Sequence, residues 1–129
     1  MAKEIIETPK APAPIGPYNQ AVKANGFLFV SGQVALVPGT GELNNDNIET
    51  EATQVMQNLE AILAEAGLNF DAVVKTTIFL SDMGLFAQVN EVYGRYFTSD
   101  YPARETVAVK TLPKSVNVEI SVIAVFPTN

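Results

Sequence analysis

Arg104 stands in the segment PARETVAV, residues 102–109, at the start of an apolar, strand-like run. The chain has only eight basic residues, and an unpaired guanidinium loses roughly several kcal/mol of solvation when it leaves water. Arg104 is therefore exposed, paired with an acid, or placed to bind an anion. The forked donors of arginine match a planar carboxylate, which makes a small carboxylic acid a natural ligand. The alternative is that Arg104 pairs with Glu105 or Glu119 and joins strands or subunits.

Glu119 lies in the segment VNVEISVIAVF, residues 116–126, whose alternation predicts a strand. One face of this strand takes Glu119 together with Ile123 and Val125. We therefore expect the carboxyl group to be partly covered, with a raised pKa unless a cation or hydrogen-bond donors hold it ionised. Such a carboxylate could hold and polarise a water molecule for hydrolysis or proton transfer.

Tyr18 follows a stretch with prolines at positions 9, 12, 14 and 17. Proline fixes the backbone, so this stretch is a stiff loop that presents Tyr18, although a plain surface connector is equally consistent with it. Tyr18 and Ser31 are the hydroxyl groups that could donate or relay protons beside Glu119. The chain contains no histidine, so any catalysis depends on carboxylates, hydroxyls, amides, Arg, Lys or the backbone.

Strands are predicted near residues 19–24 and 27–31, because Asn25-Gly26 between apolar segments favours a hairpin with a type I′ turn. Ser31 and Gly32 stand where the second strand ends. A glycine there lets the backbone approach a ligand closely, but a β-bulge explains it equally well.

Asn90 is the polar member of an otherwise apolar helical face that contains Phe86, Val89, Tyr93 and Phe97. A buried amide needs hydrogen-bond partners. Asn90 is therefore either a structural bridge or a site residue that faces a cavity.

The remaining elements are read from periodicity. A helix is expected from about residue 49 to residue 66, with an Asp46/Glu49 capping pattern before it and Gly67 after it. The other expected elements are a strand over 73–80, a second helix capped by Ser81 or Asp82, and a final hairpin of residues 104–112 and 116–126.

This order of elements predicts an α+β two-layer sandwich, with one sheet and both helices on one face. At 129 residues we expect one domain, residues 1–129. The other face of the sheet is also apolar, so we expect self-association in a cyclic oligomer to cover it. A size-exclusion profile with light scattering that reports a monomer would contradict this expectation.

Composition narrows the classes of partner and location. The chain has no cysteine and a net charge of −6, which disfavours thiol chemistry, nucleic acid and anionic membranes. No signal peptide or membrane span is apparent, so we expect a cytoplasmic or organelle-stromal protein.

The chain resembles the RidA/YjgF family of reactive intermediate deaminases along nearly its whole length. The motifs that carry the resemblance, in this order and spacing, are GPYNQAV, FVSGQV, the helix ending EAGL, VVKTTIFLSDM, FAQVNEVYGRYF, YPARETVAV and LPKSVNVEISVIAV. The resemblance implies a chorismate-mutase-like fold with a mixed, mainly antiparallel sheet, assembled as a homotrimer with ligand clefts between subunits. It also implies hydrolysis of 2-aminoacrylate, 2-iminopropanoate and 2-iminobutanoate, made by pyridoxal-phosphate dehydratases, to 2-keto acids and ammonia without a cofactor or metal.

Carried onto matching residues, the resemblance implies that Arg104 clamps the substrate carboxylate and Glu119 activates the water. Tyr18 would close the pocket. The substrate-binding residues would be Ser31, Gly32, Asn90 and Thr106.

Two positions depart from the family pattern. Thr106 stands where many relatives have cysteine, which removes thiol-based regulation but keeps the backbone N–H attributed to that contact. Ser121 stands where relatives often have a second glutamate, a change that bears on how Glu119 is held.

Two other functions stay open. Some relatives are described as endoribonucleases that inhibit translation, for which a groove around Arg104, Lys110 and Lys114 would be needed. The other is a carboxylate-binding or chaperone-like protein without turnover.

Overall fold

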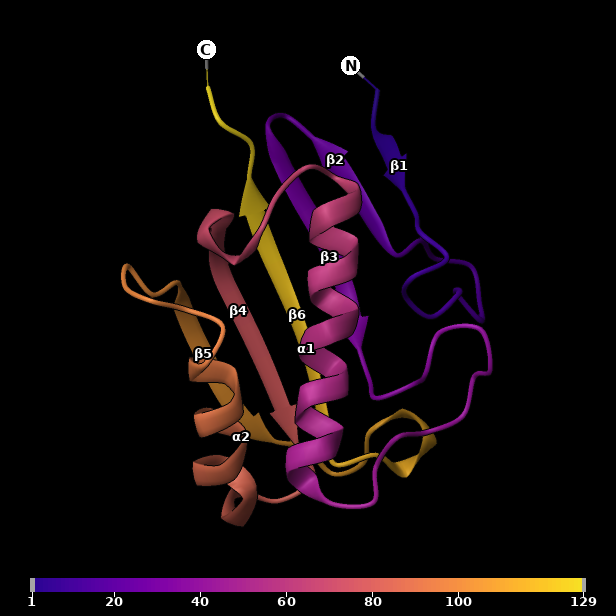
Figure 1. Cartoon of the computed structure of the whole chain (residues 1–129), viewed down its shortest axis with the longest axis vertical. Coiled ribbons are helices and arrows are strands. Elements are labelled where there is room, and N and C mark those ends of the chain that lie inside the picture. The colour runs from indigo at the N-terminus through magenta and orange to yellow at the C-terminus, as the bar shows by residue number, and fades with distance from the viewer. Residues whose placement is uncertain (1, 129) are drawn as a thin grey trace.

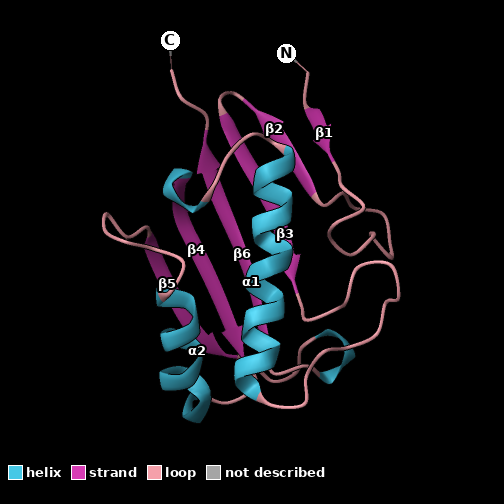
Figure 2. Ribbon diagram, viewed as in Figure 1, coloured by secondary structure: helices cyan, strands magenta, loops and turns pink. Residues whose placement is uncertain are grey.

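The protein folds into one mixed sheet of six strands with two α-helices against it, in the order β1-β2-β3-β6-β4-β5. The computed structural model describes residues 2–128. Figures 1 and 2 show both helices on the same face of the sheet, which confirms the expected α+β two-layer arrangement. The elements are β1 (Glu4–Ile6), β2 (Ala21–Ala24), β3 (Phe27–Gln33), α1 (Ile48–Glu65), β4 (Val73–Leu80), α2 (Phe86–Gly94), β5 (Ala103–Ala108) and β6 (Val118–Val125), with short 3-10 turns at Phe70–Ala72, Met83–Leu85 and Pro113–Ser115.

The final two strands are not a hairpin, so that expectation is wrong. β4 lies between β5 and β6 in the sheet, antiparallel to β6 and parallel to β5. Parallel neighbours need a crossover, and α2 supplies it between β4 and β5. β5 is therefore an edge strand, and one side of its backbone has no partner strand among residues 2–128.

The other strands lie close to their predicted ranges, although β2 begins at Ala21, two residues after its predicted start. β4 spans the predicted residues, and the Asn25-Gly26 turn has positive φ values of 53° and 80°, as a type I′ turn requires. β3 runs two residues further than expected, to Gln33, and its pairing with β6 is irregular between Val30 and Gln33. This β-bulge contains Ser31 and Gly32.

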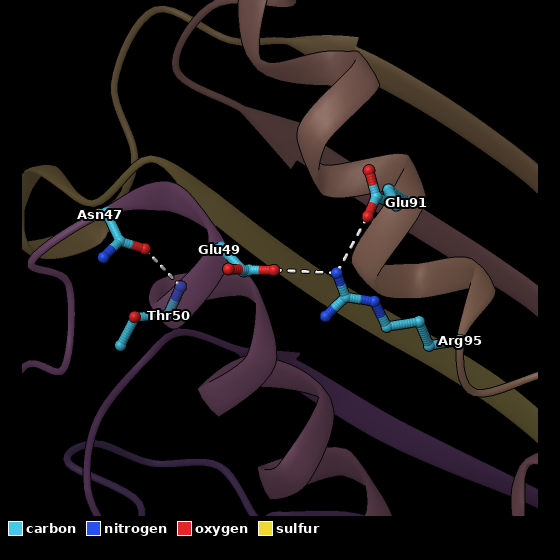
Figure 3. Close-up of polar contacts among 5 residues, drawn as sticks. All are labelled: Asn47, Glu49, Thr50, Glu91 and Arg95. Carbon is cyan, nitrogen blue, oxygen red and sulfur yellow. Dashed lines mark hydrogen bonds and ion pairs between the residues drawn. The ribbon is translucent and has the colours of Figure 1, made fainter.

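α1 buries an apolar stripe against the sheet, including Val55, Leu59 and Ile62, which are fully buried. The helix begins at Ile48, and its cap is Asn47 instead of the predicted Asp46, because the Asn47 side chain accepts a hydrogen bond from the Thr50 N–H at 2.8 Å (Figure 3). An Asx side chain at the position before the first helical residue satisfies an otherwise free donor.

α2 is tied to α1 by Arg95, which follows the helix. The Arg95 guanidinium donates to Glu49 of α1 at 2.8 Å and to Glu91 of α2 at 3.0 Å (Figure 3). These groups are exposed, so the pairs contribute little to stability. Asp82, rather than Ser81, caps the turn that leads into α2 by accepting from the Gly84 N–H.

The face of the sheet away from the helices, called here the open face, is largely apolar. Pairing places Val22, Phe29 and Ile123 in one row of this face and Phe79 and Val107 in another. Phe29 and Val107 are each 46% exposed. Within one chain this apolar surface is only partly covered.

Candidate active site

The Arg104 side chain is held at the edge of the sheet beside α2. Its Nη1 donates to the Asn90 Oδ1 at 2.7 Å. The guanidinium carbon also lies 5.1 Å from the centre of the Tyr93 ring and 5.5 Å from that of Phe86, distances typical of cation–π contacts. One amide oxygen and two ring faces therefore orient the guanidinium and leave most of its donors for a ligand.

Within one copy of the chain, Arg104 pairs with neither acid of the pairing alternative, and pairing between subunits stays a prediction. Glu105 pairs instead with Lys75 on the open face. Among residues 2–128, no carboxylate lies within ion-pair distance of Arg104. Asn90 is exposed, whereas its position in an apolar face led us to expect a buried amide. It combines the two expected roles, because it forms a hydrogen bond to Arg104 and lines a cavity.

Tyr93 and Phe86 are contacts of Arg104 that the sequence did not single out. The Tyr93 hydroxyl donates to the buried Thr76 Oγ1 at 2.9 Å, and burial raises the pKa of Tyr93 above its ordinary value. The ring thus stays neutral and fixed under the guanidinium. The signal available beforehand was that both aromatic residues share a helical face with Asn90.

A cavity of about 480 Å³ opens at this position. Its lining residues are Asn90, Tyr93, Gly94, Tyr101, Pro102 and Arg104. The cation and the apolar walls suit a small organic anion.

Glu119 lies in a second cavity of about 390 Å³. The carboxyl group is half-buried, and this burial raises its pKa, as expected. The lining residues are Ile15, Tyr18, Ser31, Gly32, Val34, Leu36, Pro113, Lys114 and Glu119. A carboxyl group with a raised pKa takes up and releases protons nearer to neutral pH, which suits a general base.

Gly32 makes room for the Glu119 side chain. A Cβ atom built on Gly32 would lie 2.8 Å from the Glu119 Cδ and 3.0 Å from its Oε1. Gly32 lies in a bulge, as one of the two earlier explanations has it, and the close approach of a ligand stays a prediction. The group that approaches it in this chain is the carboxyl group of Glu119.

Ser31 anchors the loop that carries Tyr18. Its hydroxyl donates to the Asn19 carbonyl at 2.6 Å, and its N–H donates to the Gln20 carbonyl at 2.9 Å. The Gln20 side chain is buried and bonds the backbone of Thr8. The Ser31 hydroxyl proton is thus already donated to a backbone carbonyl instead of pointing to a ligand. Tyr18, by contrast, is 48% exposed at the cavity.

Thr106 lies on β5, two residues after Arg104 and on the same side of the strand. The Val109 N–H bonds to Leu80 of β4, so alternation along the strand directs the Thr106 N–H to the unpaired edge. The Thr106 Oγ1 is buried and has no hydrogen-bond partner within the described part of the chain. Because β5 is an edge strand, the Thr106 N–H expected as a donor here also has no partner strand among the described residues.

The Arg104 and Glu119 cavities belong to opposite faces of the sheet. Arg104 of β5 pairs with the buried Thr76 of β4, which places it on the helix side. Glu119 pairs with Phe79 on the open face. One copy of the chain therefore cannot bring both side chains to the same small ligand.

Neither a metal site nor a membrane span emerges from the described residues. Within residues 2–128, no three or more acidic, histidine or cysteine side chains gather in a way that could hold a metal ion. Over the same range, no helix is both long enough and apolar enough to cross a bilayer.

Residues 8–126 match the sequence profile of a family described as Endoribonuclease L-PSP. A RutC family protein of Synechocystis is 55% identical over 99% of this chain and 100% of its own length. Reactive Intermediate Deaminase A, chloroplastic, of Arabidopsis thaliana is 45% identical over 95% of this chain and 65% of its length. The crystal structure of Escherichia coli TdcF with bound serine superposes with a TM-score of 0.91 at 41% identity, covering 96% of this chain and 99% of that one.

Proposed function

Because the chain belongs to the RidA/YjgF family, also described as Endoribonuclease L-PSP, we propose that it hydrolyses small 2-imino acids to 2-keto acids and ammonia. The observation that carries the proposal is the Arg104 guanidinium, which is oriented by Asn90 at a cavity and has no acidic partner among residues 2–128. A fixed cation with free donors is suited to a carboxylate ligand.

The complete site would form between two copies of the chain. The Arg104 cavity of one copy would meet the Glu119 cavity of the next, since the two lie on opposite faces of one sheet. The apolar open face, with Phe29 and Val107 half exposed, supports burial against other copies. A closed homotrimer would supply three equivalent sites in this way.

In the proposed reaction, Arg104 binds the carboxylate of the protonated imine. The ionised Glu119 takes a proton from a water molecule as the water oxygen bonds to the imine carbon. The protonated Glu119 then gives this proton to the nitrogen of the resulting carbinolamine. The C–N bond breaks and ammonia leaves as the C=O bond forms, while the ionised Glu119 takes up the hydroxyl proton and later releases it to ammonia or water. Holding water and substrate together supplies much of the acceleration, and no cofactor is needed.

The substrates would be 2-iminopropanoate, with its enamine tautomer 2-aminoacrylate, and 2-iminobutanoate. The Arabidopsis relative is named a reactive intermediate deaminase, and TdcF was crystallised with serine, whose carboxylate resembles that of these imines. Pyridoxal-phosphate dehydratases acting on serine and threonine would supply them. We expect the protein to act in the cytoplasm beside such enzymes.

A coupled assay tests the proposal. A pyridoxal-phosphate dehydratase converts threonine or serine into the imine, semicarbazide traps the free imine, and keto acid is measured with and without this protein. We expect wild type to suppress trapping and speed keto-acid release. Arg104→Ala should lose this activity, and Arg104→Lys should recover only part of it, because lysine keeps the charge but lacks the forked donors.

Arg95→Ala is the matched control, since Arg95 bonds Glu49 and Glu91 on the helix surface instead of lining either cavity. This variant should keep wild-type activity. Full activity in Arg104→Ala would overturn the site assignment. Carboxylate binding by the wild type without any turnover would favour a binding protein.

The family description also raises RNA cleavage. The net charge of −6 disfavours RNA binding. Salt-dependent RNA cleavage that co-purifies with the wild-type oligomer would revive this function.

A further inference from the structure

Glu51 is a fully buried carboxylate on α1 that neither cavity includes. Its Oε2 accepts hydrogen bonds from the Asn117 N–H at 2.8 Å and the Val118 N–H at 3.3 Å. Its Oε1 accepts from the Asn117 Nδ2 at 2.9 Å. Three donors thus satisfy the two buried oxygens, and within residues 2–128 no basic side chain pairs with Glu51.

Asn117 extends this contact to the end of β4. The Ser81 hydroxyl donates to the Asn117 Oδ1 at 2.9 Å, and the Ser81 N–H donates to the Asn117 carbonyl, also at 2.9 Å. A single residue before β6 is therefore fixed from two directions, by α1 and by the C-terminal end of β4.

The segment that these contacts fix forms part of the Glu119 cavity. Pro113 and Lys114 line that cavity on one side of Asn117 in the sequence, and Glu119 follows two residues after it. Lys114 and Ser115 have φ values of 58° and 54°, a left-handed conformation that costs non-glycine residues free energy. A loop with two such residues in succession needs outside contacts to hold its shape.

We propose that Glu51 is a positioning residue for the deaminase site, acting through Asn117 and Val118 on the loop and strand that place Lys114 and Glu119. The inference rests on the proposed function. Glu51 touches no substrate. It determines where the wall of the cavity and the Glu119 carboxyl group stand relative to Gly32.

Two substitutions test whether the hydrogen-bond acceptors of Glu51, and not only its bulk, position the loop. Glu51→Met has a similar volume and no acceptor for the two backbone N–H groups, so the loop should relax and kcat/KM should fall by roughly 10- to 100-fold, as for a displacement of about 1 Å. Glu51→Gln keeps one acceptor for the backbone, and a flip of the Asn117 amide lets its oxygen accept from the new NH₂ group. This variant should restore most of the activity.

Val55→Ala is the control for lost stability. Val55 is fully buried on the same helix and lies outside both cavities, so its truncation lowers the free energy of unfolding without loosening the loop. It should leave kcat/KM unchanged at temperatures where both variants are folded. If Glu51→Met does not fold, Glu51→Ala takes its place, because it removes both carboxylate oxygens without placing a larger apolar side chain among the three donors.

A measurement independent of activity completes the test. Carbon-13 NMR of the Glu119 carboxyl carbon should show its pKa, raised by burial in the wild type, fall toward the ordinary value in Glu51→Met but not in Val55→Ala. Wild-type kcat/KM and an unchanged Glu119 titration in folded Glu51→Met, or in its substitute Glu51→Ala, would overturn the positioning role. An inactive wild type would refute the proposed function, and the NMR titration would still decide whether Glu51 sets the environment of Glu119.

Discussion

Replacing Gly32 with alanine should displace the Glu119 carboxyl group while leaving the fold intact. The new Cβ would lie 2.8 Å from the Glu119 Cδ and 3.1 Å from its Cγ. Carbon atoms in contact prefer a separation of about 3.5–4.0 Å. The carboxyl group must therefore move by about 0.7 Å or more away from the bulge.

The expected cost falls on catalysis. A displacement near 1 Å in a catalytic group costs about 10²-fold in rate, so we expect kcat to fall by roughly 10- to 100-fold. Stability should change little. Gly32 has no left-handed φ that alanine would strain, and glycine to alanine at a compatible site stabilises by about 0.4–1 kcal/mol through the unfolded chain, which offsets part of the crowding.

The assay is steady-state keto-acid release by Gly32→Ala, with urea unfolding measured on the same samples. The double variant Gly32→Ala/Glu119→Gln separates a direct from an indirect effect. If Gly32 acts through Glu119, adding Gly32→Ala to Glu119→Gln should cause little further loss. Wild-type kcat in Gly32→Ala, or a full additional loss in the double variant, would refute the reasoning.

Three other predictions concern pH, stability and assembly. Activity should rise with pH through the raised pKa of Glu119, since the ionised form is the base, and Glu119→Gln should remove this acid limb from the kcat/KM profile. Between the ordinary and the raised pKa of Glu119, the native state binds more protons than the unfolded state, so Glu119 should make the free energy of unfolding fall as pH rises. The opposite slope would contradict the burial argument. Tyr93→Phe should lower the free energy of unfolding by about 1–2 kcal/mol in urea titrations, because it leaves the buried Thr76 hydroxyl without its partner; no change would show that the bond contributes nothing. Val107→Lys should shift the protein toward monomer in size-exclusion chromatography with light scattering, because it places a charge on the half-exposed apolar face; an unchanged oligomer would remove Val107 from the interface.

Periodicity predicted most of the fold because it reports which face of an element is buried. The alternation in β6 correctly placed Glu119 on the face opposite its buried neighbours in the sequence. The spacing of three and four predicted both ends of α1 to within one residue. Periodicity does not report the order in which the strands pair in the sheet. Residues 104–112 and 116–126 have the composition of two hairpin strands, and nothing local to them reveals that β4 inserts between them.

The site was only partly predictable for a similar reason. Arg104 and Glu119 stood out because charges beside apolar strands are costly, and Gly32 stood out as a strand-end glycine. The partners of Arg104 come from another element, since Asn90 precedes it by fourteen residues in the sequence. The cap at Asn47 was missed by one position, because the segment NNDN, residues 44–47, offers several residues with equal capping ability.

The placement of Arg104 and Glu119 on opposite faces has a genetic consequence if the site forms between copies. A chain that has lost Arg104 still carries an intact Glu119 half, and a chain that has lost Glu119 still carries an intact Arg104 half. Mixed in one oligomer, two separately inactive chains would rebuild complete sites wherever the intact halves meet, about a quarter of all sites for random assembly of equal amounts. Loss of function at these two positions would therefore complement between alleles, whereas two defects in the same half would not.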